Sequence, residues 1–139
     1  MPPKPIIADK QLINAVIEVL EKDERVVFAY LYGSLISEGQ GNDIDVAVYS
    51  KDRIDPYLLS AELKIALNET SEISPDACDF RIINDILGKG DIFATLYLRN
   101  VLEDGRLLIN KAHDVHSDFL ERYGSKYREC EGLMQEVLG

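Results

Sequence analysis

Hydrophobic residues in the first third of this chain recur first at helical and then at strand spacing. After a Pro-rich extension over residues 1–8, Asp9 can cap an amphipathic helix, because apolar residues three or four apart follow it: Leu12, Ile13, Val16, Ile17 and Leu20. Two runs rich in β-branched and aromatic residues, 26–32 and 44–49, predict strands. Residues 33–42 hold three glycines and predict a long loop between these strands.

The rest of the chain alternates in the same way. Pro56 can open a helix to about residue 67, residues 76–83 predict a third strand, and residues 91–102 predict a helix that ends before Gly105. A short strand over 106–110 precedes a long C-terminal helix over 113–138. One apolar stripe runs along this helix, interrupted only by Gly124, and must pack on the domain or on a partner: Val115, Phe119, Tyr123, Tyr127, Cys130, Met134 and Val137.

This order of elements predicts an α/β layer architecture of the α+β kind. The first two strands are neighbours that can form a hairpin, so the sheet of about four strands should be mixed, with flanking helices. With 139 residues, of which 46% are hydrophobic, the chain should form a single domain, 1–139, with its own core. Within it, the C-terminal helix 113–138 is a possible partner interface.

The net charge of −10 argues against nucleic acid as a partner. With 25 acidic against 15 basic residues, the chain should repel a phosphate backbone and should not bind nucleic acid stably by itself. Most of the acidic residues are interpreted as surface residues that keep the protein soluble. No apolar run is long enough for a membrane span, and the start lacks a secretory signal, so we expect a cytoplasmic protein without membrane contact. Cys78 and Cys130 fit no zinc or disulfide pattern and should be reduced, packed thiols.

The tripeptide Asp43-Ile44-Asp45 is the first candidate for chemistry. Side chains two apart on a strand share a face, so the two carboxylates would converge and repel each other unless a cation lies between them. Mg²⁺ prefers such oxygen ligands together with substrate phosphates. With 13 aspartates in the chain, chance alone produces about one Asp-x-Asp, so its context must decide.

The dipeptide Gly33-Ser34 supplies part of that context. It closes the strand before the loop and precedes Asp43 by nine residues. A glycine there lets the backbone approach a phosphate, and the serine hydroxyl can donate to phosphate oxygens. Gly-Ser is also an ordinary turn dipeptide, and both interpretations remain open from the residues alone.

Taken together, four segments resemble the minimal nucleotidyltransferases of the DNA polymerase beta-like superfamily. They are residues 30–34, 43–48 and 78–80, with the closing segment 102–108. The resemblance implies the fold of that superfamily and two Mg²⁺ ions held by Asp43, Asp45 and Asp79. It also implies nucleotide contacts from Gly33 and Ser34, and a role for Asp79 in activating the attacking hydroxyl. By residue type alone, Asp79 would be interpreted as a surface acid at a strand edge.

The resemblance also implies a reaction and a partner. Minimal domains of this kind transfer AMP from ATP to a tyrosine of an HEPN-type toxin and act as its antitoxin. Two alternatives stay open: transfer to a small molecule of the aminoglycoside type, and a catalytically impaired antitoxin that only binds. The last is motivated by a departure from the family, which commonly has an arginine in the loop after Gly-Ser.

No basic residue lies between Gly33 and Asp45. Four cations elsewhere could replace the missing arginine, but their positions do not follow from the sequence: Lys51, Arg53, Lys64 and Arg81. His113 and His116 lack further ligands for a metal and are interpreted as surface or helix-start residues. Five tyrosines at strand and helix spacing are interpreted as core or interface residues: Tyr30, Tyr32, Tyr97, Tyr123 and Tyr127.

Overall fold

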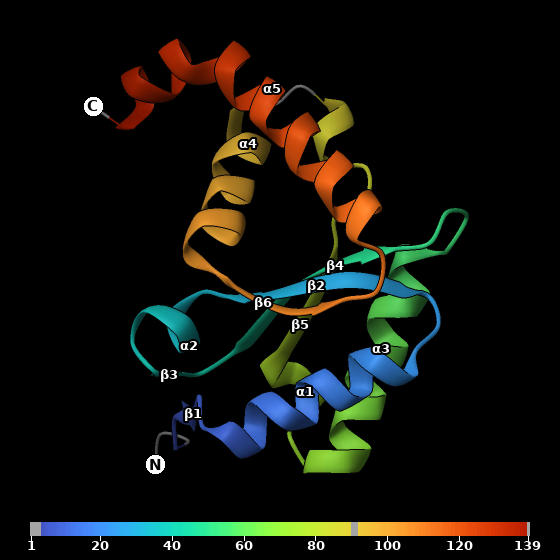
Figure 1. The fold of residues 1–139 in the computed structure, drawn as a ribbon. Coiled ribbons are helices and arrows are strands. Elements are labelled where there is room, and N and C mark those ends of the chain that lie inside the picture. Colours follow the sequence, from blue (N-terminus) through green and yellow to red (C-terminus); the bar gives the residue numbers. More distant parts are fainter. Residues whose placement is uncertain (1–3, 90–91, 139) are drawn as a thin grey trace.

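Four strands form a mixed sheet with helices on both faces in the computed structural model, which describes residues 4–89 and 92–138 (Figure 1). The elements are β1 (Ile6–Ile7), α1 (Lys10–Lys22), β2 (Val26–Tyr32), α2 (Ser34–Ser37), β3 (Gln40–Gly41), β4 (Ile44–Ser50), α3 (Pro56–Ser71), β5 (Cys78–Ile82), α4 (Ile92–Arg99), β6 (Arg106–Asn110) and α5 (His113–Leu138). Short 3-10 turns occupy Pro75–Ala77 and Ile86–Lys89, and a π-helical turn, Asn100–Asp104, continues α4.

The strand order in the sheet is β5-β4-β2-β6. β2 pairs antiparallel with β4 and β6, whereas β4 and β5 are parallel and are connected through α3. The predicted mixed sheet of four strands is therefore confirmed. A parallel pair needs a long crossover, and α3 supplies it.

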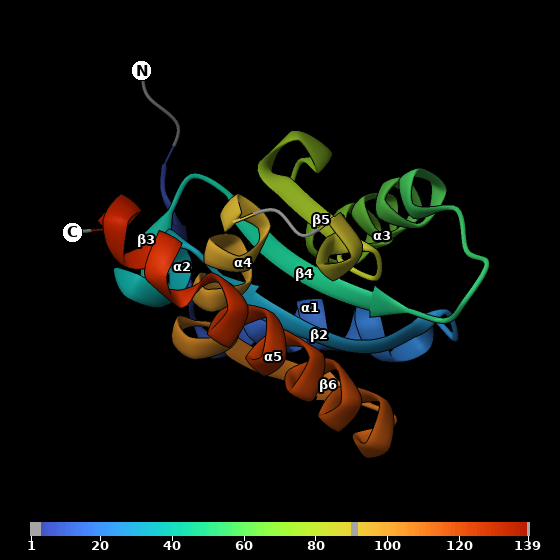
Figure 2. The ribbon, with the colours of Figure 1, turned by 90° about the horizontal axis from the view of Figure 1, so that it is seen from above.

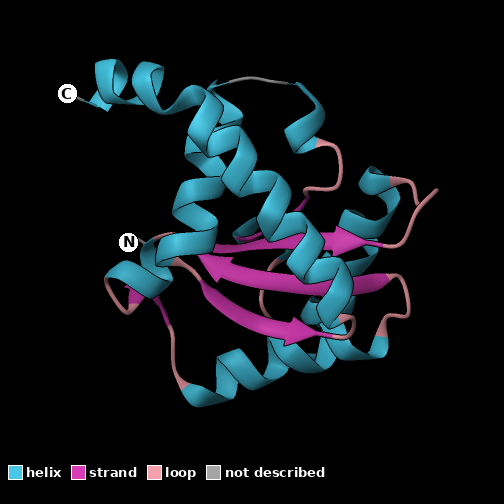
Figure 3. Ribbon diagram, turned by 45° about the horizontal axis from the view of Figure 1, so that its top comes forward, coloured by secondary structure: helices cyan, strands magenta, loops and turns pink. Residues whose placement is uncertain are grey.

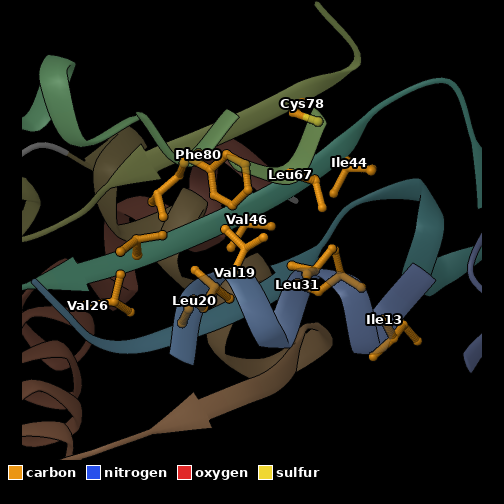
Figure 4. Close-up of a cluster of buried hydrophobic side chains, with 14 of the residues drawn as sticks. Ile13, Val19, Leu20, Val26, Leu31, Ile44, Val46, Leu67, Cys78 and Phe80 are labelled. Atoms are coloured by element: carbon orange, nitrogen blue, oxygen red, sulfur yellow. The ribbon is translucent and has the colours of Figure 1, made fainter. Parts of the chain in front are cut away.

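Helices α1 and α3 cover one face of the sheet, and α4 and α5 cover the other (Figure 3). Side chains alternate along β4, so that Val46 and Val48 enter the core under α1 and α3, and Ala47 enters the core under α4 and α5. The central strand β2 is buried along its whole length. Figure 4 shows the first core, in which Phe80 of β5 and Leu20 of α1 contribute fully buried side chains.

The helix starts follow the predicted capping chemistry. Asp9 Oδ1 accepts a hydrogen bond of 2.9 Å from the backbone N–H of Leu12, and Asp55 caps α3 directly before Pro56. Helix α3 continues four residues beyond the predicted end at 67 and stops at Ser71. Glu72, in the left-handed conformation, ends it.

Two other predicted boundaries are corrected. The loop predicted over 33–42 contains α2 and β3, and β3 pairs with β1 of the Pro-rich extension. The strand predicted over 76–83 begins only at Cys78, because a 3-10 turn precedes it. Asp91, where the third helix was predicted to begin, lies outside the described residues.

The apolar stripe of α5 packs mainly on the domain itself. Phe119, Tyr123, Cys130 and Met134 are buried, and α5 lies against α4. The helix continues through Gly124 without a break, and the side chain of Val137 lies outside the described ones. Among the helices described, none has the length and apolar composition to span a membrane.

Candidate active site

Two of the three predicted acids lie side by side in the sheet. Asp45 is the second residue of β4 and Asp79 the second residue of β5, and the parallel register pairs their Cα positions. Paired residues of neighbouring strands share a face, so both carboxylates lie on the face that α4 and α5 cover. Asp43 lies two residues before Asp45, just before β4 begins. Figure 2 shows α4 over the end of the sheet at which β4 starts.

The charges of the three acids act on one another at Asp45. Its side chain is half-buried, and burial raises the pKa of its carboxyl above the ordinary value. The negative charges of Asp79 and then Asp43 raise this pKa further. The repulsion expected from the sequence is therefore present, and it involves all three predicted residues.

Tyr32, on β2, continues the pairing of Asp79 and Asp45 across the sheet to a third strand. It is the last residue of β2 and is paired with Asp45 in the antiparallel register. Its hydroxyl accepts a 3.0 Å hydrogen bond from the hydroxyl of Tyr97 in α4. Burial, this hydrogen bond and the charges of Asp45 and Asp79 raise the pKa of Tyr32, so it stays protonated.

Gly33 is needed where it stands for two reasons. Its φ is 84°, in the left-handed region that favours glycine. A Cβ atom on Gly33 would lie 2.7 Å from Oδ2 of Asp45. The turn after β2 therefore leaves the Asp45 carboxylate room that any other residue would fill.

The loop behind this turn folds back on itself. The Gly33 carbonyl accepts hydrogen bonds from the backbone N–H groups of Ile36 and Ser37, which forms the single turn of α2. A Cβ atom on Gly41 would overlap the hydroxyl of Ser34, so β3 lies against the start of α2. The phosphate contact of Ser34 stays a prediction.

Of the four cations considered in the sequence, Arg81 lies on the same face as the acids. It follows Asp79 by two residues on β5, and its guanidinium carbon is 4.1 Å from the ring centroid of Tyr97. Both Asp79 and Arg81 line a groove of about 580 Å³ along β5. Lys51 and Arg53 follow the far end of β4 and line the same groove from that end, and Lys64 lies on α3 near Cys78, which faces the other core.

The carboxylates suit a hard divalent cation that substrate phosphates also bind. All the donors are oxygens, and besides burial the charges of Asp79 and Asp43 raise the pKa of Asp45, charges that a cation would neutralise. Within residues 4–89 and 92–138, no group of three or more His, Cys, Asp or Glu side chains is preassembled around one point. Mg²⁺ commonly takes only one or two carboxylates and fills its other positions with water and phosphate oxygens, so an open site fits it.

Two residues beside the acids were missed in the sequence. Tyr32 and Tyr97 were interpreted as core or interface residues, and both are packed in the core under α4 and α5, but their hydroxyls meet beside Asp45. The sequence feature that could have indicated Tyr32 is its position directly before Gly33. His116, interpreted as a surface or helix-start residue, lies in the first turn of α5, where it is half-buried with Nε2 2.7 Å from the Tyr30 hydroxyl.

The sequence pattern of the family described as Polymerase beta, Nucleotidyltransferase matches residues 14–114. This chain belongs to that nucleotidyltransferase family. The match covers all the predicted site residues of the nucleotidyltransferase. No curated protein sequence matches the chain.

Solved structures share the fold of this nucleotidyltransferase. A chain in the structure of a tri-AMPylated Shewanella oneidensis HEPN toxin in complex with MNT antitoxin is 20% identical, with a TM-score of 0.58 over 94% of this chain and 98% of that chain. A chain in the toxin–antitoxin structure MntA-HepT is 19% identical, with a TM-score of 0.56 over 94% and 100% of the two chains. A chain in a toxin–antitoxin structure with AMP-PNP is 22% identical, with a TM-score of 0.59 over 91% and 98%.

Proposed function

We propose that this chain is a Mg²⁺-dependent nucleotidyltransferase that transfers AMP from ATP to a hydroxyl of an HEPN-type toxin and thereby acts as an antitoxin. The proposed catalytic site is supported above all by one observation. Asp45 is paired with Asp79 across two parallel strands, directly beside the turn at Gly33. Membership of the nucleotidyltransferase family supports the reaction type.

In the proposed reaction, the acceptor hydroxyl oxygen attacks the α-phosphorus of ATP. The bond from that phosphorus to the oxygen bridging to the β-phosphate breaks, and pyrophosphate leaves. Asp79 accepts the hydroxyl proton, and Gly33 and Ser34 contact the phosphates. Asp43, Asp45 and Asp79 are the residues that would hold Mg²⁺, which when bound supplies positive charge at the attacking and leaving oxygens.

The similar structures support the acceptor and the nucleotide in this proposal. One of them contains an AMPylated HEPN toxin with an MNT antitoxin, and another contains AMP-PNP. These chains match this one over nearly their whole length, which supports the same class of acceptor. In the proposal the protein acts in the cytoplasm, as the sequence analysis expects.

Helix α5 remains our candidate for the partner interface. Most of its apolar stripe is used inside the domain, so the residues left for a partner lie on its outer side. Leu120, Leu133 and Leu138 are exposed there. An apolar contact of this kind would bring the toxin to the side of the sheet that carries Asp45 and Asp79.

Label transfer from ATP tests the proposal. The purified chain is incubated with α-labelled ATP, Mg²⁺ and its candidate HEPN partner, and the partner is resolved on a gel. We expect label on the partner, its loss on addition of a chelator, and a fall of at least about a hundredfold when Asp43 and Asp45 are both replaced by Asn, because the metal ligands are then removed. Asp76→Asn, an exposed acid before β5, is the matched control and should keep full transfer.

Each other outcome has a definite meaning. Transfer that survives the double substitution would refute the role of these acids. A stable complex without any label would leave a binding antitoxin, the alternative that the loop without basic residues favours. Label on an aminoglycoside and none on the toxin would identify the small-molecule alternative.

A further inference from the structure

Arg81 is a cation on the active-site face that no carboxylate of the described residues engages in an ion pair. Along β5 it shares a face with Asp79, and its Cα is paired with that of Ala47, two residues beyond the pair of Asp45 and Asp79. Arg81 is absent from all the ion pairs formed among the described residues. Its side chain is exposed, so its donors are available to a ligand.

Tyr97 holds this arginine in a defined orientation. The guanidinium carbon lies 4.1 Å from the centroid of the Tyr97 ring, and the Tyr97 hydroxyl donates to that of Tyr32 over 3.0 Å. The rings of Tyr32 and Tyr97 are perpendicular, with centroids 5.5 Å apart. A guanidinium stacked on a ring keeps its N–H groups free at the edge of its plane, where they can meet two oxygens at once.

The charge around the acids favours a protein cation beside the phosphates of an anionic substrate. A nucleoside triphosphate brings several negative charges to a place that already holds Asp43, Asp45 and Asp79. The loop from Gly33 to Asp45 contains no Lys or Arg. Lys51 and Arg53 line the same groove as Asp79 and Arg81, but they follow the far end of β4, whose seven residues span roughly 20 Å at about 3.3 Å per residue. Arg81 is therefore the nearest of these cations to the acids along the sheet.

The groove along β5 gives the phosphates a place beside Arg81. Its volume of about 580 Å³ lies within the range of about 300–1,000 Å³ of small-ligand sites, and Asp79 and Arg81 both line it. β5 is at the edge of the sheet, so the groove is open to solvent on that side. A chain of phosphates that meets Asp79 at its α-phosphate can extend along the strand toward Arg81.

We propose that Arg81 binds the β- and γ-phosphates of the nucleoside triphosphate and that Tyr97 positions it. This inference rests on the proposed nucleotidyltransferase function and adds the phosphate contact that the loop lacks. Arg81 acts on binding of the triphosphate, and Tyr97 acts only through Arg81.

Binding measurements without turnover test this assignment. Calorimetric titration of the full chain with AMP-PNP and MgCl₂ is compared with titration by AMP. Arg81→Ala should weaken AMP-PNP binding roughly ten- to hundredfold, because a charge-assisted contact is lost, and should leave AMP binding unchanged. Arg81→Lys should lie between, since it keeps the charge but not the fork of donors. Arg128→Ala, on α5, removes the same side chain elsewhere and should change neither affinity.

A pair of substitutions at Tyr97 separates positioning from packing. Tyr97→Phe keeps the ring under the guanidinium and should bind AMP-PNP within about threefold of the wild type, whereas Tyr97→Leu should approach Arg81→Ala. Thermal unfolding of each free variant shows whether its fold is retained. Should Arg81→Ala be unfolded, Arg81→Lys carries the same comparison.

The binding results distinguish an error in the role of Arg81 from an error in the proposed function. If the wild type binds AMP-PNP and Arg81→Ala binds it equally well, the assignment of Arg81 is wrong and the function stands. An equal loss for AMP and AMP-PNP also overturns it, because the contact is then not with the β- and γ-phosphates. If the wild type binds neither nucleotide, the proposed function fails and the role of Arg81 fails with it.

Discussion

At the scale of single residues, the site keeps Asp45 in surroundings that disfavour its charge. Burial and the neighbouring charges of Asp79 and Asp43 raise its pKa, and the turn at Gly33 keeps other atoms away from its Oδ2. A carboxylate strained in this way is useful only if a cation or substrate arrives to balance it. Without a bound cation, the ionised Asp45 should therefore make the folded protein less stable.

The first prediction concerns Asp45 and pH. Because the folded state raises the pKa of Asp45, ionising this residue costs stability: the cost is absent below the unfolded pKa of about 4 and grows as the pH rises through the folded value. In chelator at pH 7, Asp45→Asn should be more stable than the wild type, by less than about 1 kcal/mol because solvent reaches the side chain.

Thermal unfolding at pH 4 and pH 7, with and without MgCl₂, measures this effect. The advantage of the variant should shrink toward pH 4, and MgCl₂ should stabilise the wild type more than the variant. Asp76→Asn is the control and should show neither trend. A variant less stable than the wild type at pH 7 in chelator would contradict the repulsion that we infer.

At the scale of elements, Lys111 connects two segments far apart in sequence. It follows β6, and its Nζ donates to the carbonyls of Leu20, Glu21 and Asp23 at the C-terminal end of α1, over 3.1, 3.0 and 2.9 Å. The last carbonyls of a helix lack partners within the helix and carry partial negative charge. One ammonium group thus caps α1 and fastens it to the edge of the sheet.

The second prediction is that this cap contributes measurably to stability. Lys111→Met keeps the length of the side chain but removes its donors and charge, and it should lower the free energy of unfolding by about 1–2 kcal/mol. Lys22→Met at the same helix end removes only an exposed ion pair with Glu18 and should cost a few tenths of a kcal/mol. Urea unfolding compares the two, and equal losses would show that Lys111 does not act as a cap.

At the scale of the whole molecule, the layer of α4 and α5 closes the face of the sheet on which the site lies. Phe119 of α5 is fully buried, with its ring centroid 5.5 Å from that of Phe28 and 5.3 Å from that of Tyr49. Helix α5 packs in turn on α4, which carries Tyr97. The position of Tyr97 beside the acids thus depends on the packing of both helices.

The third prediction follows from this packing. Phe119→Ala should lower the free energy of unfolding by about 3–5 kcal/mol, because it leaves a cavity between the sheet and α5. Phe119→Leu fills most of this space and should cost less than half as much. Leu120→Ala, on the outer side of the same turn, should cost less than about 1 kcal/mol. Similar losses for Phe119→Ala and Leu120→Ala would show that α5 packs loosely on the sheet.

Local patterns were sufficient to predict most of the elements. The apolar, β-branched run of β4 and the helical spacing after Asp9 predicted their elements, because a strand covered on both faces is apolar throughout and a covering helix is apolar along one face. Because the predicted strands 26–32 and 44–49 are neighbours in the chain, an antiparallel pair could be predicted, and β2 and β4 form it. The boundaries at residues 67 and 76 were missed, because a 3-10 turn and an αL residue depend on local hydrogen bonds that leave little pattern.

The sequence by itself determined the order of elements, the mixed sheet and the family resemblance, because each follows from patterns within short segments. It also predicted Asp43 and Asp45 from their spacing, and Asp79 from the resemblance. Only the tertiary structure decided which residues meet. The register of β4 and β5 brings Asp45 beside Asp79, and the packing of α4 brings Tyr97 under Arg81. Such contacts join residues tens of positions apart, and no local periodicity encodes their distance, since it is set by how the layers pack around one sheet.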